Sequence, residues 1–227
     1  MSEAWWEGHP ELFPPEPELE PLHARNYSVR AWKIDDSSFL LRGAVMDLKP
    51  GAGFQERFEA LGGQDDGRPL TIHHMVVDLT IGFPALTITD ARVVFESFPQ
   101  PGCPGITNHY RELIGLSIAR GFTHEVRQRF GGPRGCTHTT ALLQAMGPVA
   151  VQCIFSMRRA GVNAADAAAA TPPSGPASFM KDTCHVWAED GPLWQGMTEG
   201  EPPPMQLPLQ QRLRAAGLDP EEIQLWS

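Results

Sequence analysis

Four stretches of alternating apolar and polar residues, grouped in two pairs, constrain the fold of this chain more than any other feature. The first pair covers residues 27–34 and 39–47, and the second covers residues 71–81 and 86–95. Strict alternation is typical of half-buried strands, and two strands joined by a short polar turn form a hairpin. The sequence therefore predicts a four-stranded antiparallel sheet, built from two hairpins, with a single buried face.

The hydrophobic period changes after residue 105. Apolar residues then recur at intervals of three and four, which predicts helices over residues 110–121, 122–130 and 136–157. Strands followed by helices are typical of the α+β class, in which the helices cover one face of the sheet. We therefore expect an α+β domain with extended proline-rich tails.

Proline and glycine divide the chain into segments. The chain has 227 residues and 22 prolines, and much of that proline lies near the two ends. An acidic segment rich in proline cannot bury enough surface to offset its ordering entropy. We predict an extended arm (1–21), one α+β domain (22–160), a linker (161–178), a Cys-containing segment packed on the domain (179–198), and a proline-rich tail with a short amphipathic helix (199–227).

The charge and hydropathy of the chain limit the kinds of binding partner and the cellular compartment that we expect. The formal net charge of -9 argues against nucleic acid or an anionic membrane as a partner. No apolar run approaches the roughly 20 residues of a membrane span, and the acidic N-terminus differs from a signal peptide. We expect a cytoplasmic protein that acts on a small-molecule substrate. Whether the chain forms a homo-oligomer is left open. Its four cysteines are then expected to be reduced, as ligands, nucleophiles or buried residues.

The densest chemical motif is a Gly/Pro-rich turn that leads into Cys136 and His138 at the start of the longest predicted helix. Unpaired N–H groups and the macrodipole of a helix start favour a thiolate there. Cys103 lies in a similar turn. If the two turns converge, Cys103, Cys136 and His138 supply three ligands suited to zinc or iron. A fourth could be Cys184, His74 or Asp47. Alternatively, both cysteines are small buried residues at helix starts.

Two neighbouring histidines on the third strand must face opposite sides of the sheet. If Ile72 and Val76 face the core, His74 shares their face and His73 is solvated. A buried imidazole needs polar partners, so His74 is the catalytic candidate, or else a hydrogen-bonded core histidine. Asp47 is the second catalytic candidate, as a general base or as a partner of the ligands, or else a turn cap.

His23 and Arg25 lie at the beginning of the first strand and are the candidate substrate-binding residues. The guanidinium of Arg25 could bind a carboxylate or phosphate through two hydrogen bonds. A surface ion pair is the alternative.

Seven short motifs, in order along the chain, identify a family resemblance. They are LHAR (22–25), VMD (45–47), HHM (73–75), GCP (102–104), LIGL (113–116), GFT (121–123) and GCTH (135–138). In this combination they resemble the bacterial domain-of-unknown-function family DUF2889, which usually has Trp where this chain has Phe122. The resemblance implies no activity.

A more distant resemblance is topological. Antiparallel strands, a Gly-Cys turn into a helix and a second Cys turn into a long helix are similar to the iron–sulfur scaffold fold. That resemblance implies zinc or a cluster, with Cys103 and Cys136 as two of the ligands. Asp47 stands where the fold has its first cysteine.

Three functions follow as hypotheses. The first is a protein with a zinc or iron site, acting as a small-molecule metabolic enzyme. The second is a metal-free enzyme whose Cys136, paired with a histidine, acts on a small carbonyl, acyl or aromatic substrate. The third is a non-catalytic interaction or iron–sulfur scaffold-like module that docks through Trp5, Trp6 and the C-terminal helix.

Overall fold

A computed structural model describes residues 17–50, 59–62, 68–159, 181–201 and 204–221. Trp5, Trp6, most of the predicted arm and the linker 161–178 lie outside the described residues. The chain divides into two compact units, Met1–Met157 and Arg158–Ser227, and each unit is described by itself.

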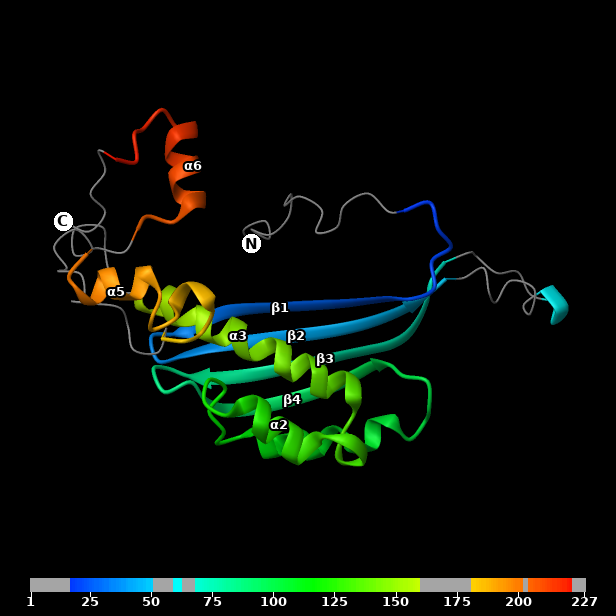
Figure 1. The fold of residues 1–227 in the computed structure, drawn as a ribbon. Coiled ribbons are helices and arrows are strands. Elements are labelled where there is room, and N and C mark those ends of the chain that lie inside the picture. Colours follow the sequence, from blue (N-terminus) through cyan, green and yellow to red (C-terminus); the bar gives the residue numbers. More distant parts are fainter. Residues whose placement is uncertain (1–16, 51–58, 63–67, 160–180, 202–203, 222–227) are drawn as a thin grey trace. The chain divides into compact units, whose positions relative to one another are not determined.

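The first unit is built on one antiparallel sheet (Figure 1). Its strands are β1 (Ala24–Asp35), β2 (Ser38–Lys49), β3 (Leu70–Gly82) and β4 (Thr87–Ser97), paired in the order β1-β2-β3-β4. Each strand pairs with its neighbour in the sequence, as expected for hairpins. The predicted α+β class and four-stranded sheet are confirmed.

One face of this sheet is buried beneath helices. On β2 and β3 the buried side chains occupy alternate positions and pair across the strands, as Leu41 does with Leu79 and Val45 with Met75. Val77 and Ile81 continue the same row on β3 and are fully buried. We call this side the helix-covered face.

The alternation on β3 corrects the orientation predicted for its histidines. Met75 and Val77 face the core, so His73 lies on the helix-covered face and His74 on the opposite one. The prediction was wrong because it took Ile72 and Val76 as core-facing. Shifting a strand assignment by one residue exchanges its two faces.

The helical elements of this unit are η1 (Cys103–Leu113), α2 (Phe122–Phe130), η2 (Gly132–Arg134) and α3 (Thr137–Arg159). Figure 1 shows α3 crossing the strands on one face of the sheet. Gly43 of β2 allows this close approach. A Cβ atom there would lie 2.7 Å from Met146 Sδ and 3.0 Å from Leu142 Cδ1.

The prediction that a helix continues to Gly121 is wrong. The 3-10 helix η1 ends at Leu113, and Gly115 adopts a φ of +91° that a right-handed helix does not tolerate. The chain then runs beside β4. Ile88 donates a hydrogen bond to Leu116 O at 2.9 Å and accepts one from Gly115 N–H at 2.8 Å.

Helix α3 carries the main apolar stripe opposite the sheet. Leu142, Leu143 and Met146 are fully buried. The segment Thr137–Met157 has a mean hydropathy of 1.4, so by length and composition alone it could cross a membrane. The expectation that no apolar stretch approaches this length is therefore wrong for α3, although its buried stripe is that of a core helix.

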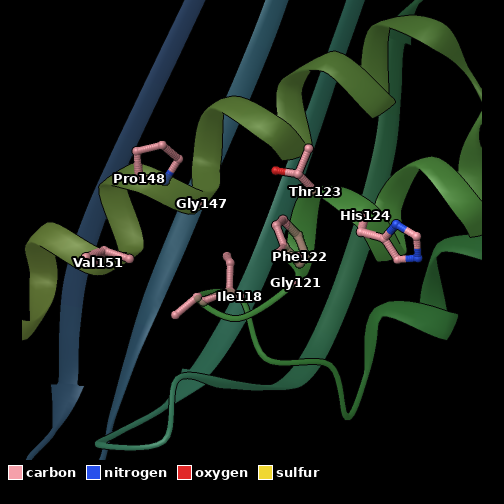
Figure 2. Close-up of a pocket in the computed structure, with 9 residues that line it drawn as sticks. Ile118, Gly121, Phe122, Thr123, His124, Gly147, Pro148 and Val151 are labelled. Carbon is pink, nitrogen blue, oxygen red and sulfur yellow. The ribbon is translucent and has the colours of Figure 1, made fainter. Parts of the chain in front are cut away.

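A pocket of about 310 Å³ lies where α3 passes the start of α2 (Figure 2). Pro148 interrupts the hydrogen-bond pattern of α3 there, because proline has no N–H. Phe122 and Ile118 form part of its wall, and none of the predicted site residues lines it.

The second unit contains η4 (His185–Trp187), α5 (Pro192–Thr198) and α6 (Leu207–Ala215). Met197 of α5 is buried, whereas α6 has no buried residue among those described. Helix α6 lies within the segment 199–227, for which a short amphipathic helix was predicted.

Candidate functional site

Three polar side chains form a row across the sheet on the helix-covered face. Arg25 on β1 lies directly opposite Asp47 on β2, and Asp47 lies directly opposite His73 on β3. Residues opposite each other on neighbouring strands project on the same face and are in contact distance. The register therefore brings together a guanidinium, a carboxylate and an imidazole that are far apart in the sequence.

Asp47 is the centre of this arrangement and is only 1% exposed. Arg25 Nε donates to Oδ1 at 2.6 Å and Arg25 Nη2 to Oδ2 at 2.7 Å. His73 Nδ1 lies 3.1 Å from Oδ2, and His23 Nε2 lies 3.6 Å from Oδ1. A buried carboxylate needs such partners, because its desolvation is otherwise very costly.

The fourth member comes from the first turn of α3. His138 Nε2 lies 3.1 Å from Asp47 Oδ2, and its ring stacks on that of His73 with centroids 3.8 Å apart. The other ring nitrogen, Nδ1, lies 3.6 Å from Cys136 Sγ. We call Arg25, Asp47, His73 and His138 the Asp47 cluster.

The charges of the cluster follow from these contacts. Hydrogen bonds from Arg25 lower the pKa of Asp47 to about 2, against the opposing effect of burial. Burial lowers the pKa of His138, and the neighbouring His73 and Arg25 act in the same direction. Near neutral pH, Asp47 is therefore ionised and His138 is neutral, which are the protonation states in which these side chains bind metal ions.

Three atoms of the cluster meet the spatial requirement for a metal site. Asp47, His73 and His138 each offer one ligand atom within 4.8 Å of the other two. Among the described residues, no other three His, Cys, Asp or Glu side chains converge in this way. Two imidazoles and one carboxylate form a donor set used for both zinc and non-haem iron.

In a comparison with protein-family models, residues 23–152 match a family described as a protein of unknown function, DUF2889. This region is more than half of the chain. The chain belongs to the DUF2889 family. The match confirms the family resemblance seen in the motifs, and it contains every residue of the Asp47 cluster.

No curated protein and no solved structure matches this DUF2889 chain. The resemblance to the iron–sulfur scaffold fold therefore has no support. In addition, Cys103, Cys136 and His138 do not form a three-ligand group among the described residues.

The structure brings some of the predicted site residues together and separates others. Asp47, His138, His23, Arg25 and Cys136 lie in or beside the cluster. Arg25 does bind a carboxylate through two hydrogen bonds, but the carboxylate is that of Asp47.

The other predicted residues lie elsewhere. His74 faces away from the cluster, on the opposite side of the sheet. Cys103 is half-buried at the start of η1, has no disulfide, and belongs to no three-ligand group among the described residues. Cys184 is exposed and belongs to the second unit.

Two residues of the site were not predicted from the sequence. His73 was placed on the wrong face, although Asp78 and Thr80 share the face of His74 and already mark it as the more polar one. Tyr110 begins the helix predicted over residues 110–121 and was given no role in the site. It is 1% exposed, and its hydroxyl accepts the N–H of Cys136 at 2.8 Å.

Proposed function

We propose that this protein binds a divalent transition-metal ion, Zn²⁺ or Fe²⁺, through Asp47, His73 and His138, and acts on a small molecule at that site. The observation that carries the proposal is the distance of 3.1 Å from Asp47 Oδ2 to each of two imidazole nitrogens. Ligand bonds of about 2.0–2.1 Å at tetrahedral or octahedral angles separate ligand atoms by about 2.9–3.4 Å. Two of the three distances between ligand atoms therefore match those around one ion, and the third, between the two imidazole nitrogens, is no more than 4.8 Å.

The surroundings of Asp47 also support this proposal. Arg25 holds the carboxylate through both oxygens, and such partners of ligating carboxylates orient them towards the ion. Three ligands from the chain leave positions for water or substrate, as in catalytic metal sites. An ion bound there would polarise a substrate oxygen or lower the pKa of bound water.

Charge suggests an anionic substrate. A divalent ion and the guanidinium of Arg25 together carry more positive charge than the single negative charge of Asp47 cancels. The occupied site would therefore have a net positive charge. His23 and Arg25 form the more exposed side of the site, at 41% and 37%, against 19% for His73 and 16% for His138. We propose that a small carboxylate-bearing substrate enters past His23 and Arg25.

The matched pair His73→Gln and His74→Gln tests the metal site. The two residues are neighbours on β3 but face opposite sides of the sheet. Purified in chelator-free buffer, the wild type and His74→Gln should carry metal in elemental analysis. His73→Gln should bind Zn²⁺ or Fe²⁺ at least about 100-fold more weakly, since loss of a direct ligand should exceed the 10–100-fold cost of losing an outer partner. Equal, weak binding by all three proteins would exclude the site.

A second candidate is a metal-free thiol enzyme, which one specific contact favours. Cys136 Sγ, His138 and Asp47 follow one another in the order of nucleophile, base and orienting carboxylate, with the sulfur 3.6 Å from the imidazole. Here Cys136 should react with iodoacetamide near neutral pH faster than the exposed Cys184. His138→Gln should remove this difference. Metal-free wild-type protein with such a thiol would favour this candidate over the metal site.

A further inference from the structure

The start of α3 is anchored by a buried phenol. Tyr110 of η1 accepts the backbone N–H of Cys136, the residue that precedes α3, at 2.8 Å. This N–H has no partner within the helix, so the hydroxyl of Tyr110 takes the place of a capping side chain. The phenol ring is stacked on Phe130, with ring centroids 4.8 Å apart. Tyr110 therefore holds the backbone of Cys136 in one place.

Cys136 in turn contacts the imidazole of His138. Its sulfur lies 3.6 Å from Nδ1, while Nε2 lies 3.1 Å from Asp47. The imidazole is thus held at both nitrogens, which leaves its ring little freedom to rotate. An ionised carboxylate can only accept, so without metal His138 carries its proton on Nε2 and its Nδ1 accepts from the thiol.

Metal binding reverses these roles. Nε2 must give its lone pair to the ion, so the one proton of the neutral ring moves to Nδ1, with no change in net charge. The sulfur then accepts from Nδ1–H. A thiol can donate in the first state and accept in the second, whereas a carbonyl or carboxylate in its place could only accept.

We infer that Cys136 and Tyr110 are positioning residues for His138: Tyr110 fixes Cys136, and the thiol of Cys136 holds the imidazole both with and without metal. This inference rests on the proposed metal site. It gives Cys136 a role different from the direct ligand predicted from the sequence.

Cobalt binding to the full chain tests the role of Cys136, because a thiolate bound to Co²⁺ produces an intense charge-transfer absorption that an imidazole does not. The wild type should lack this absorption. Cys136→Ala should bind Co²⁺ about 10–100-fold more weakly, the usual cost of losing a partner of a ligating histidine. Cys136→Ser should recover most of that loss, since a hydroxyl also donates and accepts. An absorption that disappears in Cys136→Ser, or unchanged affinity in Cys136→Ala, would overturn the inference.

One further variant tests the role of Tyr110, beside a control on α3. Tyr110→Phe keeps the ring but removes the acceptor for Cys136 N–H, so it should weaken Co²⁺ binding in the same direction as Cys136→Ala. Cys153→Ser removes a thiol from a later turn of α3 and serves as the control, which should bind Co²⁺ within about twofold of the wild type. Unchanged Co²⁺ affinity in Tyr110→Phe would contradict the role of Tyr110.

A measurement without metal separates this inference from the proposed function. In chelator-treated protein, long-range ¹H–¹⁵N spectra report which nitrogen of His138 carries the proton. We expect the proton on Nε2 in both the wild type and Cys136→Ala, because Asp47 accepts it in both. The ¹⁵N resonance of Nδ1 should nevertheless move downfield in Cys136→Ala, because this nitrogen loses the thiol that donates to it. A wild type that binds no metal would contradict the proposed function, while an unchanged Nδ1 resonance in Cys136→Ala would contradict the role of Cys136. Circular dichroism confirms that each variant is folded.

Discussion

The sheet carries two Arg–Asp pairs with the same geometry in different surroundings. Arg25 binds Asp47 and Arg42 binds Asp78, each through two hydrogen bonds of 2.6 and 2.7 Å between neighbouring strands. The Asp47 side chain is 2% exposed and lies beside two imidazoles, whereas that of Asp78 is 19% exposed. Arg42 is half exposed.

This comparison shows that the bond lengths of an ion pair do not identify a functional site. What distinguishes Asp47 is its burial and its additional partners His73 and His138, which use the lone pairs left by Arg25. A surface pair across two strands contributes little to stability, because water screens both charges. A buried carboxylate that needs three donor side chains is costly to maintain, and this cost is easier to understand where the carboxylate serves a functional site.

The largest difference between the two pairs is expected on removing the carboxylate. Asp47→Ala leaves Arg25, His73 and His138 without their shared acceptor and opens a gap under α3. We expect a loss of about 3–5 kcal/mol in the free energy of unfolding, as for other broken buried pairs. Urea denaturation followed by circular dichroism, in buffer with chelator, measures it.

Asp78→Ala is the matched control for that measurement. Its partner Arg42 can turn into solvent, so the expected loss is about 1 kcal/mol or less. Similar losses for the two variants would mean that Asp47 is an ordinary member of the sheet.

An intermediate effect is expected with pH. The pKa of Asp47 is lowered from 3.8 to about 2, so its ionised form is favoured in the folded protein. Its contribution is therefore present above about pH 4 and is lost as the pH falls towards 2. The difference corresponds to about 2 kcal/mol. The free energy of unfolding of metal-free wild type should fall by about this amount relative to Asp47→Asn between these pH values.

Parallel acid titrations of the two proteins check this prediction. If both lose stability at the same rate, the Arg25 hydrogen bonds do not act on Asp47 as the structure indicates. A carboxyl ¹³C titration of Asp47 by NMR then shows directly at which pH it takes up its proton.

The sequence was enough to predict the sheet and most of the helices because their signals are local. Alternation defined the four strands, and the stripe at Phe122, Val126 and Phe130 defined α2. The apolar spacing was misleading at Gly115. Apolar residues continue at helical intervals to Ile118, but the positive φ of Gly115 ends the helix before it. In that stretch, hydrogen bonds to β4 decide the conformation.

The site was harder to predict because it depends on register and docking. Asp47, Arg25 and His138 were all candidates, but nothing local shows that Asp47 lies opposite both Arg25 and His73. The contact of His138 with Asp47 also requires α3 to pack on the sheet, at the position that Gly43 leaves open. The face of His73 was readable, since Met75, Val77, Leu79 and Ile81 alternate on one side of β3.

The smallest expected effect is the coupling within the exposed pair, and it gives the most selective comparison. A double-mutant cycle with Arg42→Gln and Asp78→Asn should give a coupling energy of about 0.2–1 kcal/mol, which falls as salt is added. The cycle with Arg25→Gln and Asp47→Asn should give a larger coupling of about 1.5–3 kcal/mol, typical of hydrogen bonds to charged groups, with little dependence on salt. Because the hydrogen-bond lengths are the same in both pairs, the difference between the couplings reports on burial and the two imidazoles. Equal couplings with equal salt dependence would show that water reaches Asp47 as freely as Asp78, and would remove the physical ground for treating Asp47 as the centre of a site.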